Sequence, residues 1–188
     1  MSLLLPSIVV GIIVGFIRGG SLSRLTEFPF RCGWLVIVAL ALEVLIFSSW
    51  FEQLGLPAYV LPGLYVLSFL TLLAVVVMNR AYVGVLILGL GIFLNFLVIA
   101  ANGGYMPASA EVMRQVGLEE REVAMRDKGY VTNNTLATPE SKLAFLGDYL
   151  YIDLPLIRQQ VFSPGDAFIA FGMFILVSQA MVWRRWQR

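Results

Sequence analysis

The sequence predicts an all-α integral membrane protein, with about five transmembrane helices and one long segment outside the membrane. Its 188 residues are 59% hydrophobic and 13% charged, and the mean hydropathy is +0.84, whereas soluble domains are nearer half apolar and a quarter charged. The apolar residues gather in separate stretches, with a single long polar segment before the last of them. Because lipid offers no hydrogen-bond partners to the backbone, stretches that cross it are expected to be helices.

The apolar stretches approach the roughly 20 residues that a helix needs to cross a hydrocarbon core about 30 Å thick. The first is the shortest, and tilt or local thinning of the bilayer would accommodate it. We expect a single membrane domain that includes the polar segment 102–165 as an extracytoplasmic loop. The predicted helices cover residues 3–17, 34–50, 57–78, 82–101 and 167–183.

Arginine placement predicts the orientation, because the cytoplasmic flanks of spanning helices carry the excess of Arg and Lys. Arginines follow the first helix, occupy the turn between the third and fourth, and end the chain, whereas the turn 51–56 has no Arg or Lys. With five spans all of them lie on one side, so the N-terminus is expected outside and the C-terminus in the cytoplasm. These arginines are Arg18, Arg24, Arg31, Arg80, Arg184, Arg185 and Arg188.

The amino-acid composition argues against several classes of function. The chain has one cysteine, Cys32, and no histidine, which excludes an intrachain disulfide and removes the commonest ligand of zinc and haem. We therefore expect no metal site and no cofactor. The formal net charge of +1 provides no broad basic field for nucleic acid. The expected partners are the lipid bilayer and a membrane protein, a small molecule or a lipid ligand.

The polar segment contains signals for short helices. Ser109 can cap a helix that has Glu111 in its first turn, and Gly117 and Gly129 are plausible stops for two helical pieces. The Thr- and Asn-rich stretch 130–139 is expected to be irregular.

The motif at the start of this segment is Asn102-Gly-Gly-Tyr-Met-Pro107. Asn and Gly supply the left-handed backbone that ends a helix, and Pro prevents its continuation. A helix exit is one interpretation. The other is that Asn102, Gly103 and Gly104 contribute to a ligand-binding site at the membrane surface.

A second motif, Ser163-Pro-Gly-Asp166, opens the last helix. Ser163 or Asp166 can accept hydrogen bonds from the free N–H groups of that helix, and a negative charge there complements the helix dipole. Capping could account for the motif, and ligand binding by Ser163 and Asp166 is the alternative.

Glu43 is the ionisable residue deep inside a predicted span. A charged side chain at a helix centre costs roughly 2.5–3.5 kcal/mol on insertion scales. The Leu, Ile, Val and Phe residues between Trp34 and Trp50 offset it at about 0.3–0.6 kcal/mol each, so this helix can still insert. Glu43 is therefore either a proton or cation site, with Asn95 and Gln179 as candidate partners, or a protonated glutamate hydrogen-bonded within the bundle.

Four motifs together resemble one family, the domain-of-unknown-function family numbered 5317, which consists of small bacterial multispanning proteins. The resemblance implies a bacterial plasma-membrane protein and no particular activity. The motifs are Arg18-Gly-Gly-Ser-Leu-Ser-Arg24-Leu, Asn102-Gly-Gly-Tyr-Met-Pro107, Lys142-Leu-Ala-Phe-Leu-Gly-Asp148 and Val161-Phe-Ser-Pro-Gly-Asp166.

The layout of the last motif also resembles lipoprotein signal peptidase, an aspartyl membrane protease. That resemblance implies a carboxyl pair of Asp148, or Asp153 in its place, with Asp166, sharing a proton and activating water. The chain departs from the peptidase in having Ser163 where its last motif has Asn, and in lacking its Gly-Asn-x-x-Asp-Arg motif.

These observations favour a binding or accessory membrane protein, with an outer-face site under the segment 102–165. One alternative is an aspartyl-type hydrolase that uses Asp148 and Asp166, and a second is a small carrier that uses Glu43. Whether the protein is an enzyme is left open, with the balance against catalysis, since no nucleophile with a base and no phosphate-binding loop is evident in the sequence.

Overall fold

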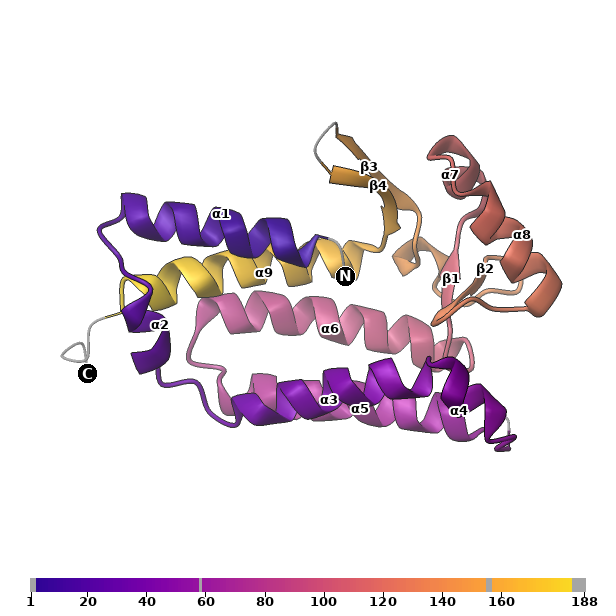
Figure 1. The fold of residues 1–188 in the computed structure, drawn as a ribbon, viewed down its shortest axis with the longest axis horizontal. Coiled ribbons are helices and arrows are strands. Elements are labelled where there is room, and N and C mark those ends of the chain that lie inside the picture. Colours follow the sequence, from indigo (N-terminus) through magenta and orange to yellow (C-terminus); the bar gives the residue numbers. More distant parts are fainter. Residues whose placement is uncertain (1–2, 58, 155–156, 184–188) are drawn as a thin grey trace.

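The computed structural model of this chain describes residues 3–57, 59–154 and 157–183, without the side chains of residues 52, 153, 154 and 157–159. The described chain is mostly helical (Figure 1). The C-terminal arginines Arg184, Arg185 and Arg188, and the side chain of Asp153, lie outside the described part.

Five apolar helices form the body of the molecule and run in alternating directions (Figure 1). α6 packs most extensively on α9, with α1 on the other side of α9, while α5 packs against α6 and α3 against α5. The helices are α1 (Leu4–Ile17), α3 (Gly33–Ile46), α5 (Val60–Met78), α6 (Val83–Ala101) and α9 (Pro164–Met181). A short α2 (Ser23–Glu27) connects α1 to α3.

Three of these helices, α5, α6 and α9, are long and apolar enough to cross a membrane. α1 and α3 are apolar but have 14 residues each, about 21 Å of helix against a hydrocarbon core of about 30 Å. The expected helix 34–50 is interrupted after Ile46, and α4 (Ser49–Gln53) follows it. Ser48 explains the break, because its hydroxyl accepts a hydrogen bond from the N–H of Phe51 at 3.3 Å and so starts a new helix.

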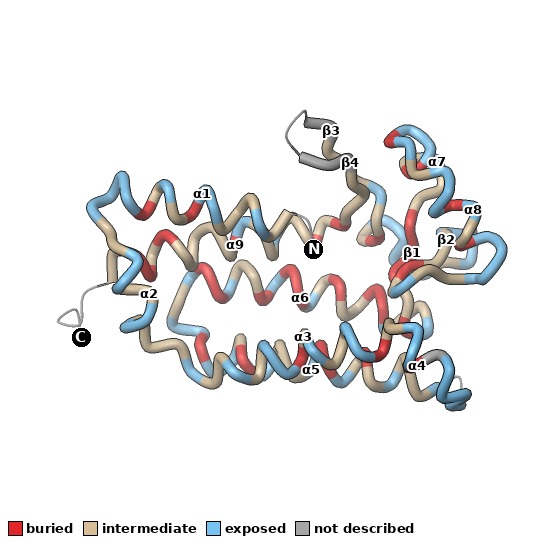
Figure 2. The backbone as a smooth tube through the Cα atoms, in the orientation of Figure 1, coloured by how far each residue is buried: buried red, intermediate tan, exposed pale blue. Residues whose placement is uncertain are grey.

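The helix surfaces suit a lipid environment. Large apolar side chains are exposed along the helices, such as Ile17 at 78%, Ile37 at 70% and Val44 at 75%. Figure 2 shows exposed residues along α1 and α3 and many buried ones along α6, in the middle of the bundle. Extended apolar faces of this kind are unfavourable in water and normal in a bilayer.

Glycines allow α6 and α9 to approach each other closely. A Cβ added at Gly84 would lie 2.6 Å from the Leu176 nitrogen and 2.9 Å from the Gly172 carbonyl oxygen. Gly91 of α6 and Gly165 of α9 face each other nearer the other end of this helix pair, and a Cβ added at either would meet the carbonyl oxygen of the other. Because both partners contribute backbone atoms, any larger residue would force the two helices apart.

The segment 102–165 folds into short elements at one end of the bundle (Figure 1). β1 pairs in parallel with β2, and β3 pairs antiparallel with β4. The all-α prediction therefore needs a correction, and so does the irregular chain expected at 130–139, where β2 lies. The elements are β1 (Met106–Ala108), α7 (Ala110–Gln115), α8 (Glu119–Lys128), β2 (Asn134–Leu136), the 3-10 turn η1 (Ala144–Leu146), β3 (Leu150–Leu154) and β4 (Ile157–Phe162).

The segment 102–165 has a small core of its own, in which Ala108, Met113 and Met125 are buried. Glu122 is also buried, and its carboxylate forms ion pairs with Arg114 and Arg126. The expected caps are present, since Ser109 accepts a hydrogen bond from the N–H of Val112 and Gly129 ends α8 with a φ of 83°. The segment is therefore a folded unit that can position side chains over the bundle.

Candidate functional site

Asp166 lies in the first turn of α9, where both of its carboxylate oxygens are hydrogen-bonded. Oδ2 accepts from the N–H of Ser163 at 3.2 Å, while the Ser163 hydroxyl accepts from the N–H of Asp166 at 3.0 Å, which completes a capping box. Oδ1 accepts from the side-chain amide of Asn95 at 2.8 Å. The Ser163 hydroxyl in turn donates to the Asn95 amide oxygen at 2.9 Å. Asn95 therefore ties the start of α9 to the middle of α6.

Asp148 follows η1 and lies beside β1, where the main chain holds it on both sides. Its N–H donates to the Pro107 carbonyl and its carbonyl accepts from the Ser109 N–H, both at 2.9 Å. Its Oδ2 accepts from the Asn134 side-chain amide at 2.7 Å. Asn134 is itself buried, and its amide oxygen accepts from Arg121 at 2.8 Å.

The second carboxylate oxygen of Asp148, Oδ1, is buried and has no hydrogen-bond partner among the described residues. Burial raises the pKa of Asp148 from 3.8 to about 7, and the negative charge of Asp166 adds to this rise. The hydrogen bond from Asn134 and the positive charge of Arg121 oppose it. Asp148 and Asp166 are thus two interacting carboxyl groups in different surroundings, one fully hydrogen-bonded and the other not.

Tyr65 of α5 joins this cluster from the bundle side. Its hydroxyl accepts a hydrogen bond from the Asn133 side chain at 3.1 Å. The Tyr65 ring is buried against Phe47 and Phe69, with ring centroids 4.9 and 5.1 Å away. Asn133 is the chain neighbour of Asn134, which bonds Asp148, so the Tyr65 hydroxyl is linked to the surroundings of Asp148 through adjacent residues.

Asn102, Gly103 and Gly104 form the exit of α6. The Gly104 N–H donates to the Ile99 carbonyl at 2.8 Å, and Gly103 and Gly104 both have positive φ, as in a Schellman motif. The Asn102 amide bonds both the N–H and the carbonyl of Lys142, at 2.9 and 2.8 Å. These groups hold the segment 102–165 onto the end of α6. Ligand binding by Asn102, Gly103 and Gly104 stays a prediction.

Glu43 of α3 contacts Ser68 of α5, rather than the expected Asn95 or Gln179. The Ser68 hydroxyl lies 2.9 Å from Glu43 Oε1 and 2.8 Å from the Tyr65 carbonyl oxygen. The Ser68 hydroxyl is the donor in both contacts, which together form a three-centre hydrogen bond. A glutamate hydrogen-bonded within the bundle accounts for this arrangement, and the carrier hypothesis gains no support from it.

The described residues contain no group of three or more His, Cys, Asp or Glu side chains that could hold a metal ion.

Replacing Asn95 with alanine is expected to reduce the free energy of unfolding by about 1–3 kcal/mol, because it leaves Asp166 Oδ1 without a donor and the buried Ser163 hydroxyl without an acceptor. Thermal unfolding of the purified variant in detergent would measure the loss. Thr71→Ala is the control, because among the described residues its hydroxyl bonds only the Leu67 carbonyl of its own helix. Equal stability of Asn95→Ala and Thr71→Ala would contradict the structural role of Asn95.

Sequence reasoning missed several members of this cluster. Asn95 had a visible signal, as an amide inside a long apolar helix, but was expected to meet Glu43. Asn133 and Asn134 lie in the stretch expected to be irregular, and their pairing with Tyr65 and Asp148 depends on the strand pairing of β1 with β2. Nothing local to the sequence indicates those contacts.

Comparisons with known proteins bear on the family. A family model, described as a family of unknown function (DUF5317), matches residues 27–178. A relative from Thermotoga maritima, described as an uncharacterized protein, is 29% identical over 109 residues. That alignment covers 58% of this chain and 59% of the relative. No solved structure matches the chain. The family match covers most of the sequence and agrees with the resemblance seen in its motifs, and the chain therefore belongs to the DUF5317 family of unknown function.

Proposed function

We propose that this chain is a multispanning protein of the bacterial plasma membrane, in which all five apolar helices lie in the bilayer. The described arginines at the end of the bundle away from segment 102–165, such as Arg31 and Arg80, support an orientation with that end in the cytoplasm. In this orientation the N-terminus and the segment 102–165 face the outside, and the C-terminus is cytoplasmic.

We further propose that the outer face carries a binding site at Asp148 and Asp166, under the segment 102–165. The observation that supports it is the buried Oδ1 of Asp148, which has no hydrogen-bond partner among the described residues. An unsatisfied buried carboxylate oxygen costs about 1–3 kcal/mol or more. A ligand that donates a hydrogen bond to this oxygen recovers that energy on binding.

The chemistry of the site selects a class of ligand. Two carboxyl groups with mutual repulsion attract a cation, and the free acceptor of Asp148 requires a donor. Primary amines and guanidines meet both requirements, because each combines a positive charge with N–H donors. Since the pKa of Asp148 is about 7, its charge is present above that pH and lost below it. Binding should therefore be tighter at pH 8 than at pH 5.5.

The test uses the purified protein in detergent with a panel of small primary amines and guanidines as probes. We expect at least one probe to raise the thermal unfolding temperature at pH 8, with a stabilisation of about 2.7 kcal/mol at a hundredfold excess over Kd. Asp148→Asn should abolish the rise, and Asp127→Asn, an exposed aspartate of α8, should preserve it. If no probe stabilises the protein, or if Asp148→Asn responds as the wild type does, the proposed site is wrong.

A second candidate is aspartyl-type hydrolysis, which the asymmetry of the carboxyl pair favours. Asp166 accepts two hydrogen bonds, whereas Asp148 has a pKa near neutrality. Such a difference is what an acid and a base need in order to share one reaction. Turnover of a membrane-embedded peptide by the wild type, lost in Asp166→Asn while that variant stays folded, would favour hydrolysis over binding alone.

A further inference from the structure

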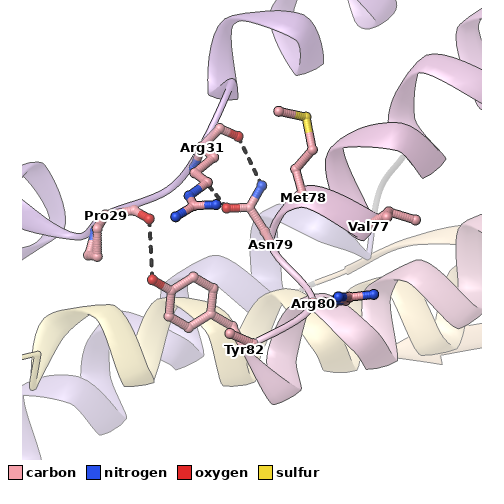
Figure 3. A pocket seen from close by; sticks show the side chains of 8 residues that line it. Pro29, Arg31, Val77, Met78, Asn79, Arg80 and Tyr82 are labelled. Carbon is pink, nitrogen blue, oxygen red and sulfur yellow. Dashed lines mark hydrogen bonds between the residues drawn. The ribbon is translucent and has the colours of Figure 1, made fainter. Parts of the chain in front are cut away.

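A pocket lies at the other end of the bundle, opposite the segment 102–165. It has a volume of about 410 Å³, within the range of about 300–1,000 Å³ that is usual for ligand sites. Its walls are the chain before α3, at Pro29 and Arg31, and the turn from α5 to α6, at residues 77–82 (Figure 3). Both α5 and α6 are long enough to span a bilayer, so the pocket lies where two candidate spanning helices end.

Side-chain hydrogen bonds join the two walls. The buried Asn79 amide accepts from the Arg31 N–H at 2.7 Å and donates to the Arg31 carbonyl at 2.9 Å, while also donating to Val75 of its own helix. Tyr82 donates to the Pro29 carbonyl at 3.2 Å. Figure 3 shows the contacts of Asn79 with Arg31 and of Tyr82 with Pro29 as dashed lines between the two walls. The loops are thus held at a set distance, and the pocket between them is a built feature.

Positive charge lines this pocket. Arg31 and Arg80, one from each wall, are its charged lining residues. Both side chains are exposed, and among the described residues neither forms an ion pair. The described ion pairs all lie in the outer segment, between residues 111 and 126. Two guanidinium groups are therefore available to an anion.

The guanidinium groups, and the aromatic residues beside them at the helix ends, indicate the chemistry of the ligand. Guanidinium binds phosphate through paired N–H donors in a planar fork. The Tyr82 ring packs against Phe28 in a tilted arrangement and edge-on against Trp183, with ring centroids 4.6 and 6.2 Å away. Such aromatic clusters are typical of the level of lipid headgroups. Basic pockets between spanning helices are a known mode of anionic headgroup binding. We propose that this pocket binds a phosphate group through Arg31 and Arg80, carried either by an anionic lipid headgroup or by a soluble phosphate ester.

The experiment measures binding to the purified full-length protein in detergent by native mass spectrometry. The lipid arm compares phosphatidic acid with diacylglycerol of the same chains, which lacks the phosphate. The soluble arm uses inorganic phosphate and glycerol 3-phosphate. Binding in the first arm alone identifies a lipid headgroup, and binding in the second identifies a soluble ligand.

Arg31→Gln and Arg80→Gln should each weaken binding about tenfold or more, and Arg18→Gln, an exposed arginine at the same end outside the pocket, should leave it unchanged. Asn79→Ala keeps both arginines but releases the walls, so it should also weaken binding, with circular dichroism to check the fold. The proposal is overturned if no phosphate compound binds, or if phosphatidic acid binds no tighter than diacylglycerol and neither soluble phosphate compound binds. It is also overturned if all three arginine variants lose binding equally.

Discussion

The folded protein is expected to lose stability as the pH rises from 3.8 to about 7, the limits set by the unfolded and folded pKa of Asp148. In this interval the folded state binds more protons at Asp148 than the unfolded state does, so the free energy of unfolding falls with pH. Below this interval Asp148 makes its full contribution to the free energy of unfolding, and above the interval it makes none. From the two pKa values the loss is up to about 4 kcal/mol.

Asp148→Asn separates this effect from every other titrating group. The variant has no charge to bury, so it should match the wild type within about 1 kcal/mol at pH 4 and be several kcal/mol more stable at pH 8. Unfolding in detergent across pH 4–8 gives the difference between the two profiles. Asp127→Asn serves as the matched control and should follow the wild type throughout. A difference between wild type and Asp148→Asn that does not change with pH would show that Asp148 is not buried as described.

Gly84→Leu is expected to separate α6 from α9 and to reduce the free energy of unfolding by about 3 kcal/mol or more. The added side chain would meet the Leu176 nitrogen and the Gly172 carbonyl, which are backbone atoms that cannot rotate away. Since α9 holds Asp166 against Asn95 of α6, the same change should also disturb the hydrogen bonds of Asp166 at the other end of the helix pair. Thermal unfolding, followed by tryptophan fluorescence, measures the effect.

Gly63→Ala provides the control for this substitution. Gly63 lies in α5, and a Cβ added there meets nothing within 4 Å. Alanine is also the better helix former, by up to about 1 kcal/mol. We therefore expect Gly63→Ala to be as stable as the wild type or slightly more so. Loss of stability in both variants would mean that glycine flexibility, rather than close packing of α6 on α9, matters at these positions.

Much of the helical framework could be predicted from the sequence, because its signals are local. Hydropathy over about 20 residues places α5, α6 and α9 within a few residues of their observed bounds. Caps are equally local, as Ser109 and Gly129 show. The interruption between α3 and α4 was missed, since a serine in an apolar run can either continue a helix or cap a new one.

The short strands could not be predicted for a different reason. β1 and β2 have three residues each, which is too short for a period-two pattern to be recognised. The two strands pair because the chain after α8 runs back beside β1. This path depends on the packing of Met113 and Met125 in the small core of the segment 102–165. Their pairing in turn brings Asn134 to Asp148.

The sequence by itself determined that this is an apolar, mostly helical chain with the character of a membrane protein, because the free energy of placing each residue in lipid depends on its own side chain and its near neighbours. Only the tertiary structure decided which polar groups meet. Asn95 and Asp166 are 71 residues apart, and Asn79 and Arg31 are 48 apart. Such contacts depend on the closure of long loops and on shape at the helix contacts, and no local pattern encodes either of these.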